Sequence, residues 1–343
     1  MIQFGFCVPI FAMPGGGLFR TPAYERLDAV TTIDMAVTAD RLGYDSLWVA
    51  DHLFLGRDDA ILEGWTTLAT LAGATQRAKL GRIHMAHFLR HASMTAKMAA
   101  TLDQLSGGRL IHFVDGGNRA EEFMAYGLPW VEPVESRIEH LVEELELTLA
   151  LWTQDGPVDY RGRFHQLRSA RCTPRPVQQP HPPIWLGESN PDMLDAVARY
   201  AQGWNSVPVP VAEMSLRLQA LQAACAKVGR PYDEIEKSLE MQILVAPDLN
   251  GVRTKLRSML ALTPPGAPDP QADPQMAAFL SGSTDTPPDA LTRMTLIGDS
   301  SQVAAQLQDY IDIGVSHFLL WFLDAPDEAG LRQFIDDVAP RWR

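Results

Sequence analysis

The fold is decided by a repeated unit, and one clear copy reads Leu42-Gly43-Tyr44-Asp45-Ser46-Leu47-Trp48-Val49-Ala50-Asp51-His52. The residues that lead into it, Tyr24–Leu42, carry apolar side chains at helical spacing. Ser46–Val49 is a short apolar run, which is typical of a strand buried on both faces of a parallel sheet. Polar Asp51 and His52 follow this strand after Ala50. The unit is therefore a helix, a buried strand and a polar strand end.

The same alternation recurs along the chain. The apolar runs are Ile2–Val8, Ser46–Val49, Leu80–Met85, Leu110–Val114, Pro183–Leu186, Trp204–Val207, Leu239–Ala246 and Ser316–Phe322. The expected helices are Tyr24–Leu42, Met94–Leu105, Val134–Trp152, Pro191–Tyr200, Val211–Val228, Ser301–Ile313 and Glu328–Val338. Eight strand runs in 343 residues fit a closed α/β barrel, the (β/α)8 TIM barrel, better than an open sheet with fewer strands. We expect a single barrel domain over residues 1–343.

Two insertions interrupt the repeat, one after the fourth strand and one after the seventh. Residues 156–175 are expected to form a small hairpin, with strands at Val158–Tyr160 and Phe164–Leu167. Residues 264–288 are rich in Pro, Ala, Asp, Ser and Gly and show little periodicity. A loop of this length inside a compact domain is usually a lid or disordered. Both a lid over the barrel mouth and a tolerated surface insertion remain open.

Composition and charge disfavour several kinds of partner. The 42 acidic residues outnumber the 29 basic ones, and the resulting charge of −13 repels nucleic acid and anionic lipid. Cys7, Cys172 and Cys225 are far apart, so neither a disulfide framework nor a thiolate metal site is indicated. Met1–Pro9 lacks the basic region of a signal peptide, and no apolar stretch reaches membrane-spanning length. A cytoplasmic location is expected.

Candidate site residues lie at the strand ends, because barrel active sites form at the carboxyl ends of the strands. The polar ends are Asp51-His52, His84-Met85-Ala86-His87, Asp115-Gly116-Gly117-Asn118-Arg119 and Gly187-Glu188-Ser189-Asn190. The glycine turn before Asn118 and Arg119 offers close backbone approach and a guanidinium. Ser189 leads into a helix whose first N–H groups favour a phosphate. These neighbouring turns suggest one phosphate-bearing ligand, with ordinary turns and helix caps as the alternative.

The histidines raise the alternative of a metal-dependent hydrolase. His84 and His87 could act as ligands together with Asp51 and His52, but residues three apart on a strand need not converge. The chain has no HxH pair on a strand and no HExxH helix, so no metal is expected. It also lacks a P-loop, a GxSxG elbow and a GxGxxG turn after the first strand. Phosphate-loop, serine-hydrolase and Rossmann chemistry are therefore not indicated.

Extended motifs surround these strand ends. They are Leu42–Leu53, Gly64–Ala69, Leu80-Gly81, Arg90-His91, Ala96–Asp103, Leu105–Arg109, Pro174–Gln178, Pro182–Gly187 and Ala198–Asn205. Together they resemble the luciferase-like flavin-dependent monooxygenases, and the resemblance covers nearly the whole chain except Pro247–Arg293. It implies a (β/α)8 barrel, usually a homodimer, that holds FMN or the deazaflavin coenzyme F420 in its mouth.

The resemblance also implies roles for individual residues. Asp51 and His52 would lie near the cofactor ring, and Met85 against its isoalloxazine face. The phosphate and ribityl positions would be Asn118, Arg119, Gly187, Glu188 and Ser189. His52 or His84 would handle a proton, because the usual histidine pKa of about 6.5 is close to neutrality.

The cofactor and the reaction stay open at this stage. Many relatives have small residues where this chain has His84–His87, and Gly-x-Gly-Trp where it has Asp115–Asn118. The expected function is a monooxygenase that uses reduced FMN and O2 to oxygenate a small organic substrate. An F420-dependent hydride-transfer oxidoreductase is the alternative, and a non-catalytic flavin-binding barrel is a third possibility. No NAD(P)H motif is visible, so a separate NAD(P)H:flavin reductase is the expected source of reduced flavin.

Overall fold

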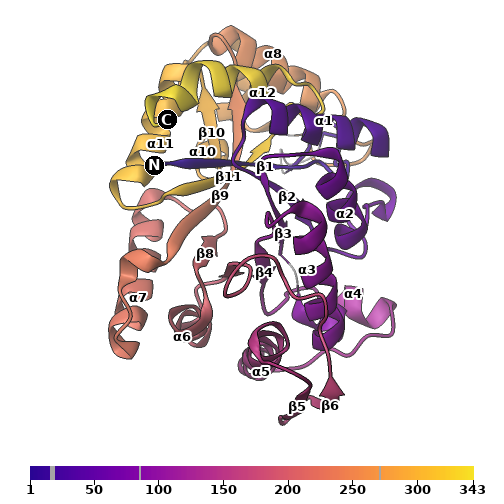
Figure 1. The fold of residues 1–343 in the computed structure, drawn as a ribbon. Coiled ribbons are helices and arrows are strands. Elements are labelled where there is room, and N and C mark those ends of the chain that lie inside the picture. The colour runs from indigo at the N-terminus through magenta and orange to yellow at the C-terminus, as the bar shows by residue number, and fades with distance from the viewer. Residues whose placement is uncertain (16–19, 85, 270–271) are drawn as a thin grey trace.

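The protein is a parallel barrel surrounded by helices, seen in a computed structural model that describes residues 1–15, 20–84, 86–269 and 272–343 (Figure 1). The barrel strands are β1 (Gln3–Cys7), β2 (Ser46–Ala50), β3 (Lys79–Ile83), β4 (His112–Val114), β7 (Ile184–Leu186), β8 (Gly203–Ser206), β9 (Glu236–Val245) and β11 (His317–Phe322). The helices are α1 (Ala29–Leu42), α2 (Gly64–Ala74), α3 (Ala92–Ser106), α4 (Ala120–Ala125), α5 (Val134–Thr153), α6 (Pro191–Tyr200), α7 (Val211–Val228), α8 (Leu249–Leu260), α9 (Pro274–Ser281), α10 (Asp289–Thr292), α11 (Ser300–Asp312) and α12 (Ala329–Gln333). In the described part of the chain, none of these helices combines the length and the apolarity that a bilayer crossing requires.

The strands form a ring in which every neighbouring pair is parallel. The order is β3-β2-β1-β11-β9-β8-β7-β4. Two isolated parallel bridges, Leu80 with Leu110 and Ala86 with Asp115, join β3 to the β4 segment. The Leu80 N–H also donates to the carbonyl of Arg109 at 2.8 Å. The (β/α)8 barrel expected from the sequence is confirmed.

Tryptophan rings fill the barrel interior because glycines stand beside them. Trp48 in β2 and Trp185 in β7 are buried, with ring centroids 5.2 Å apart. A Cβ on Gly81 would lie 2.2 Å from Trp48, and a Cβ on Gly203 would lie 2.3 Å from Trp185. Any larger residue at either glycine would collide with a ring, so small and large residues alternate across neighbouring strands. This packing supports the strand ends above it.

The insertion after the fourth barrel strand is a hairpin, as expected. Its strands are β5 (Val158–Arg161) and β6 (Gln166–Ala170), and the second strand begins two residues later than predicted. The Glu143 carboxylate on α5 accepts hydrogen bonds from three consecutive N–H groups of residues 163–165, at 2.7, 2.9 and 2.6 Å. These bonds hold the tip of the hairpin against α5.

The insertion after the seventh strand contains more regular structure than the sequence indicated. Residues 274–281 of the expected irregular excursion form α9, whereas residues 270–271 lie outside the described residues. The short strand β10 (Thr295–Gly298) pairs in parallel with the end of β9. A second hydrophobic cluster, separate from the main core, consists of Leu244, Ala246, Val252, Leu256, Met259, Leu260, Met276, Phe279, Leu280, Leu291, Ile297 and Leu323. A lid over the mouth and a surface insertion both stay open as interpretations of residues 264–288.

Candidate active site at the barrel mouth

His84 spans the barrel mouth between two carboxylates. Its Nδ1 lies 3.1 Å from Asp115 Oδ2, just after β4, and its Nε2 lies 2.8 Å from Glu240 Oε2 in β9. Because each ring nitrogen faces a carboxylate, both can donate only when the ring is an imidazolium. Burial alone lowers the pKa of His84, but the hydrogen bonds to Asp115 and Glu240 outweigh it and raise the pKa from 6.5 to about 10. The ring therefore carries a positive charge at neutral pH.

Glu240 anchors this group from the opposite side of the barrel. Trp321 Nε1 donates to its Oε1 at 2.6 Å, and Arg20 Nη2 lies 2.6 Å from the same oxygen. Burial raises the pKa of Glu240, yet the charges of Arg20 and His84 outweigh that effect and lower it to about 2. Glu240 was not among the residues expected at the site, because it lies inside the apolar run Leu239–Ala246. It is the one carboxylate within that run, and this was the available signal.

Glu188 adds a carboxyl group that titrates near neutrality. Its backbone has a φ of 69°, and its carbonyl accepts a hydrogen bond from Trp204 Nε1 at 2.7 Å. The side chain turns toward the β4 end, where a Cβ on Gly116 would lie 3.4 Å from Glu188 Oε1. Burial and then the nearby charge of Asp115 raise the pKa of Glu188 to about 7. This carboxyl group can therefore both give and take a proton at neutral pH.

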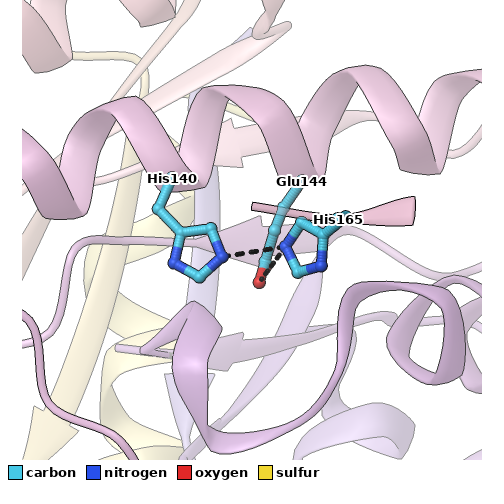
Figure 2. A group of neighbouring side chains, drawn as sticks. All are labelled: His140, Glu144 and His165. Atoms are coloured by element: carbon cyan, nitrogen blue, oxygen red, sulfur yellow. Dashed lines mark hydrogen bonds and ion pairs between the residues drawn. The ribbon is translucent and has the colours of Figure 1, made fainter. Parts of the chain in front are cut away.

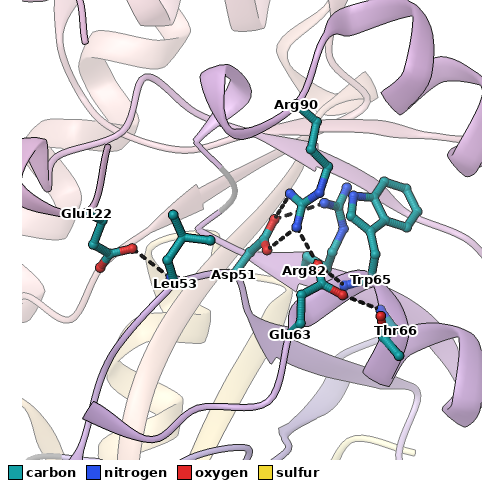
Figure 3. Close-up of polar contacts among 8 residues, drawn as sticks. All are labelled: Asp51, Leu53, Glu63, Trp65, Thr66, Arg82, Arg90 and Glu122. Atoms are coloured by element: carbon teal, nitrogen blue, oxygen red, sulfur yellow. Dashed lines mark hydrogen bonds and ion pairs between the residues drawn. The ribbon is translucent and has the colours of Figure 1, made fainter. Parts of the chain in front are cut away.

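Asp51 lies in a buried ion-pair network beside the mouth (Figure 3). Its carboxylate lies 3.0 Å from Arg82 Nη1 and 3.0 Å from Arg90 Nη1, and Arg90 also pairs with Glu63. The Arg82 guanidinium lies over the Trp65 ring at 3.5 Å. The Asp51 carboxylate therefore pairs with two guanidinium groups. These ion pairs connect the end of β2 to β3 and to the start of α2. Contact between Asp51 and a cofactor ring stays a prediction.

His52 and Arg119 share the buried carboxylate of Glu122. His52 Nδ1 lies 2.9 Å and Arg119 Nη1 lies 3.0 Å from Glu122 Oε1. The other oxygen of Glu122 accepts from the Leu53 N–H at 2.8 Å, as Figure 3 shows. His52 thus belongs to a different group of charges from His84. The Arg119 guanidinium faces Glu121 and Glu122, and its contact with a phosphate stays a prediction.

Ser189 and Asn118 keep their polar groups available at the ends of two adjacent strands. Ser189 is half-buried and Asn118 is exposed, and neither side chain hydrogen-bonds to any residue that the structure describes. The helix α6 starts just after Ser189, where the Asn190 side chain accepts from the Asp192 N–H. These positions suit a phosphate-bearing ligand.

Gly187 and Met85 are the two remaining residues that were expected to contact the cofactor. A Cβ on Gly187 would lie 3.0 Å from the Phe113 ring, so packing alone favours glycine there. Met85, expected against the cofactor ring, lies outside the described residues. A role for each in binding a cofactor stays a prediction.

Replacing the Asp51 carboxylate should show how much its ion pairs contribute to the free energy of unfolding. Asp51→Asn removes the negative charge that the guanidinium groups of Arg82 and Arg90 share, and Arg82 is only 1% exposed. We expect the free energy of unfolding to fall by ~3–5 kcal/mol, measured by urea denaturation. Asp58→Asn is the control, because that side chain is 86% exposed. Equal denaturation midpoints for the two variants would contradict the structural role of Asp51.

The pKa of His84 predicts a dependence of stability on pH. The folded pKa of about 10 lies above the ordinary value of 6.5, so the native state binds the extra proton between these pH values. The stabilisation is complete below pH 6.5 and is lost as the pH rises through about 10. Relative to His84→Gln, the wild type should lose stability over this interval, as measured by thermal unfolding at a series of pH values. Parallel curves for the two proteins would refute the ion-pair assignment.

Comparisons with known proteins agree with the fold and extend over nearly the whole chain. Residues 3–317 match the family model described as luciferase-like monooxygenase. A phthiodiolone/phenolphthiodiolone dimycocerosates ketoreductase of Mycobacterium tuberculosis is 30% identical over 332 residues, covering 88% of this chain and 81% of that protein. An F420-dependent glucose-6-phosphate dehydrogenase of Nakamurella multipartita is 28% identical over 320 residues, covering 90% and 91%.

A solved structure supports the architecture. The crystal structure of a long-chain alkane monooxygenase superposes with a TM-score of 0.79 at 16% identity, covering 99% of this chain and 90% of that one. Likeness at this identity concerns the fold alone. The match of the family model to residues 3–317 shows that the chain belongs to the luciferase-like monooxygenase family.

Proposed function

We propose that this protein is an oxidoreductase that transfers a hydride between coenzyme F420 and a carbonyl or hydroxyl group of an organic substrate. The observation that carries this proposal is the set of ionisable groups in the mouth, Glu188, Asp115, His84 and Glu240. Reduction of a carbonyl adds one hydride and one proton, so a proton donor must stand beside the hydride donor. The relatives named as a ketoreductase and an F420-dependent dehydrogenase support this chemistry.

The residues of the mouth divide the work between binding and proton transfer. The Ser189 hydroxyl, the Asn118 amide and the first turn of α6 would hold the phosphate of the cofactor. The bound cofactor supplies or accepts the hydride. Glu188 gives its proton to the substrate oxygen during reduction and takes it back during oxidation. The fixed positive charge of His84 stabilises negative charge that develops on that oxygen.

A second candidate is the monooxygenase that the sequence first suggested. The observation in its favour is the family model, whose description names a luciferase-like monooxygenase over residues 3–317. Reduced FMN also carries a phosphate, so the same turn beside Ser189 could hold it. In that case the substrate would receive an oxygen atom from O2, and a separate reductase would provide the reduced flavin.

A binding titration separates the two candidates. We expect the purified apoprotein to bind F420 at least ~10-fold more tightly than reduced FMN measured under anaerobic conditions. Ser189→Ala should weaken F420 binding by ~10-fold, which is the usual effect of losing a hydrogen bond to a charged group. Ser258→Ala, on the exposed face of α8, is the matched control. A preference for reduced FMN would favour the monooxygenase, and binding of neither cofactor would contradict both proposals.

The proton donor is identified by the pH profile of turnover. With reduced F420 and a ketone substrate, kcat should fall as the pH rises through about 7, because Glu188 must be protonated to act as the acid. Glu188→Gln should remove this limb of the profile and lower kcat by ~10²-fold. An unchanged limb in the variant would assign the proton to another group, with His52 the next to test.

A further inference from the structure

A cluster of three histidines and one glutamate lies away from the mouth, where α5 meets the hairpin. We refer to His87, His140, Glu144 and His165 as the histidine cluster. His140 and Glu144 are one helical turn apart on α5, and His165 lies between β5 and β6. Figure 2 shows the side chains of His140, Glu144 and His165 pointing toward one another. His87 belongs to a short 3-10 turn that follows β3.

The spacing of the nitrogen and oxygen atoms suits a single metal ion. His140 Nε2 lies 2.9 Å and Glu144 Oε1 lies 3.5 Å from His165 Nε2, and one atom from each of the three residues falls within 4.8 Å of the others. Glu144 Oε2 lies 3.3 Å from His87 Nδ1. Zinc–nitrogen bonds of about 2.0–2.1 Å in a tetrahedral site place the ligand atoms roughly 3.3 Å apart. Small side-chain shifts would therefore bring these groups onto one ion.

The separation of the rings agrees with the same geometry. The ring centroids of His140 lie 4.7 Å from those of His165 and 5.2 Å from those of His87. Two imidazoles bound to one tetrahedral ion have centroids roughly 5 Å apart, given the same bond lengths. His87 lies next to this group but outside the three residues whose ligand atoms all approach within 4.8 Å of one another.

An unpaired nitrogen atom points independently to a missing ligand. His87 is only 1% exposed; its Nδ1 faces the Glu144 carboxylate at 3.3 Å, and its Nε2 has no hydrogen-bond partner within the described ranges. Buried polar atoms are nearly always paired, so an orphan of this kind calls for a water or an ion. A cavity of about 10 Å³ is lined by His87, His112 and Glu144 but not by His140 or His165, so it lies beside the other ligand positions rather than between them. That volume holds about one water-sized particle.

We propose that the histidine cluster binds a divalent transition-metal ion, with zinc as the best fit. Imidazole nitrogens with one carboxylate oxygen form a typical ligand set for zinc, whereas magnesium and calcium prefer oxygen ligands alone. The ion would be held by His140, Glu144 and His165, with His87 next to Glu144. It would fasten the hairpin and α5 to the turn after β3.

The fastened turn is connected to the active site through the backbone. The N–H of His87 donates to the carbonyl of Asp115 at 3.3 Å, and Asp115 is the residue that faces His84. The ion would thus fix the end of β3 without touching the substrate. This inference does not depend on which cofactor the mouth binds.

Metal binding is tested on untagged full-length protein that has been stripped with a chelator. After incubation with zinc and removal of the excess, we expect one ion per chain by elemental analysis and a rise in Tm of a few degrees. Cobalt in place of zinc should give the visible absorption bands of a tetrahedral site. His140→Ala and His165→Ala should lose the ion, whereas His181→Ala, a half-buried histidine outside the cluster, should keep it.

Glu144→Gln separates loss of metal binding from loss of folding, because glutamine keeps the shape of the glutamate side chain. Circular dichroism of the variant should match that of the wild type, while its zinc content and its cobalt bands fall. Equal zinc retention by the wild type and the cluster variants would mean adventitious binding and would overturn the proposal. Absence of retained zinc and cobalt in the wild type would overturn it as well, and would leave the cluster as a hydrogen-bonded contact.

Discussion

The whole structure depends on the contact between tryptophan rings and glycines inside the barrel. Trp48 can lie in the interior only because Gly81 on the next strand has no side chain, and Gly203 allows the same for Trp185. This fit sets how closely the strands approach and lets the ring close. A closed parallel ring brings all carboxyl ends to one rim, where residues distant in sequence meet.

The rim holds charges in two different states. In the Asp51 network, two cations surround one carboxylate, and the result is a rigid connection between the ends of β2 and β3. In the centre, one imidazolium faces two carboxylates, and Glu188 stands close by as a further carboxyl group. Burial, and then the charge of Asp115, raise the pKa of Glu188. Burial, which stabilises the core, therefore also raises the pKa of a carboxyl group in the mouth.

The barrel was predictable because buried parallel strands give short apolar runs, and all eight barrel strands lie where such runs occur. Helix ends were less predictable. The first helix begins at Ala29 rather than Tyr24 because the Asp28 carboxylate accepts from the Thr31 N–H and caps it there. The helix α8 was missed because Asn250-Gly251 is typical of a turn.

The site was predictable only where its residues follow the strands directly. His84 and Asp115 are such residues, whereas Glu240 lies within a strand and shows its role only once β9 faces β3 across the ring. The residues of the histidine cluster come from segments near positions 87, 140 and 165. They are too far apart in the sequence to form a recognisable motif.

The second hydrophobic cluster has a consequence for how the protein moves and how it varies. Because α8, α9 and β10 pack around apolar side chains of their own, this part can open as a cooperative unit while the barrel stays closed. We refer to α8, α9 and β10 as the crown. Amide protons of the crown should exchange with solvent together, and earlier than those of the barrel strands. The crown covers much of Pro247–Arg293, the stretch without the family motifs, so its sequence can diverge while the ring keeps its shape.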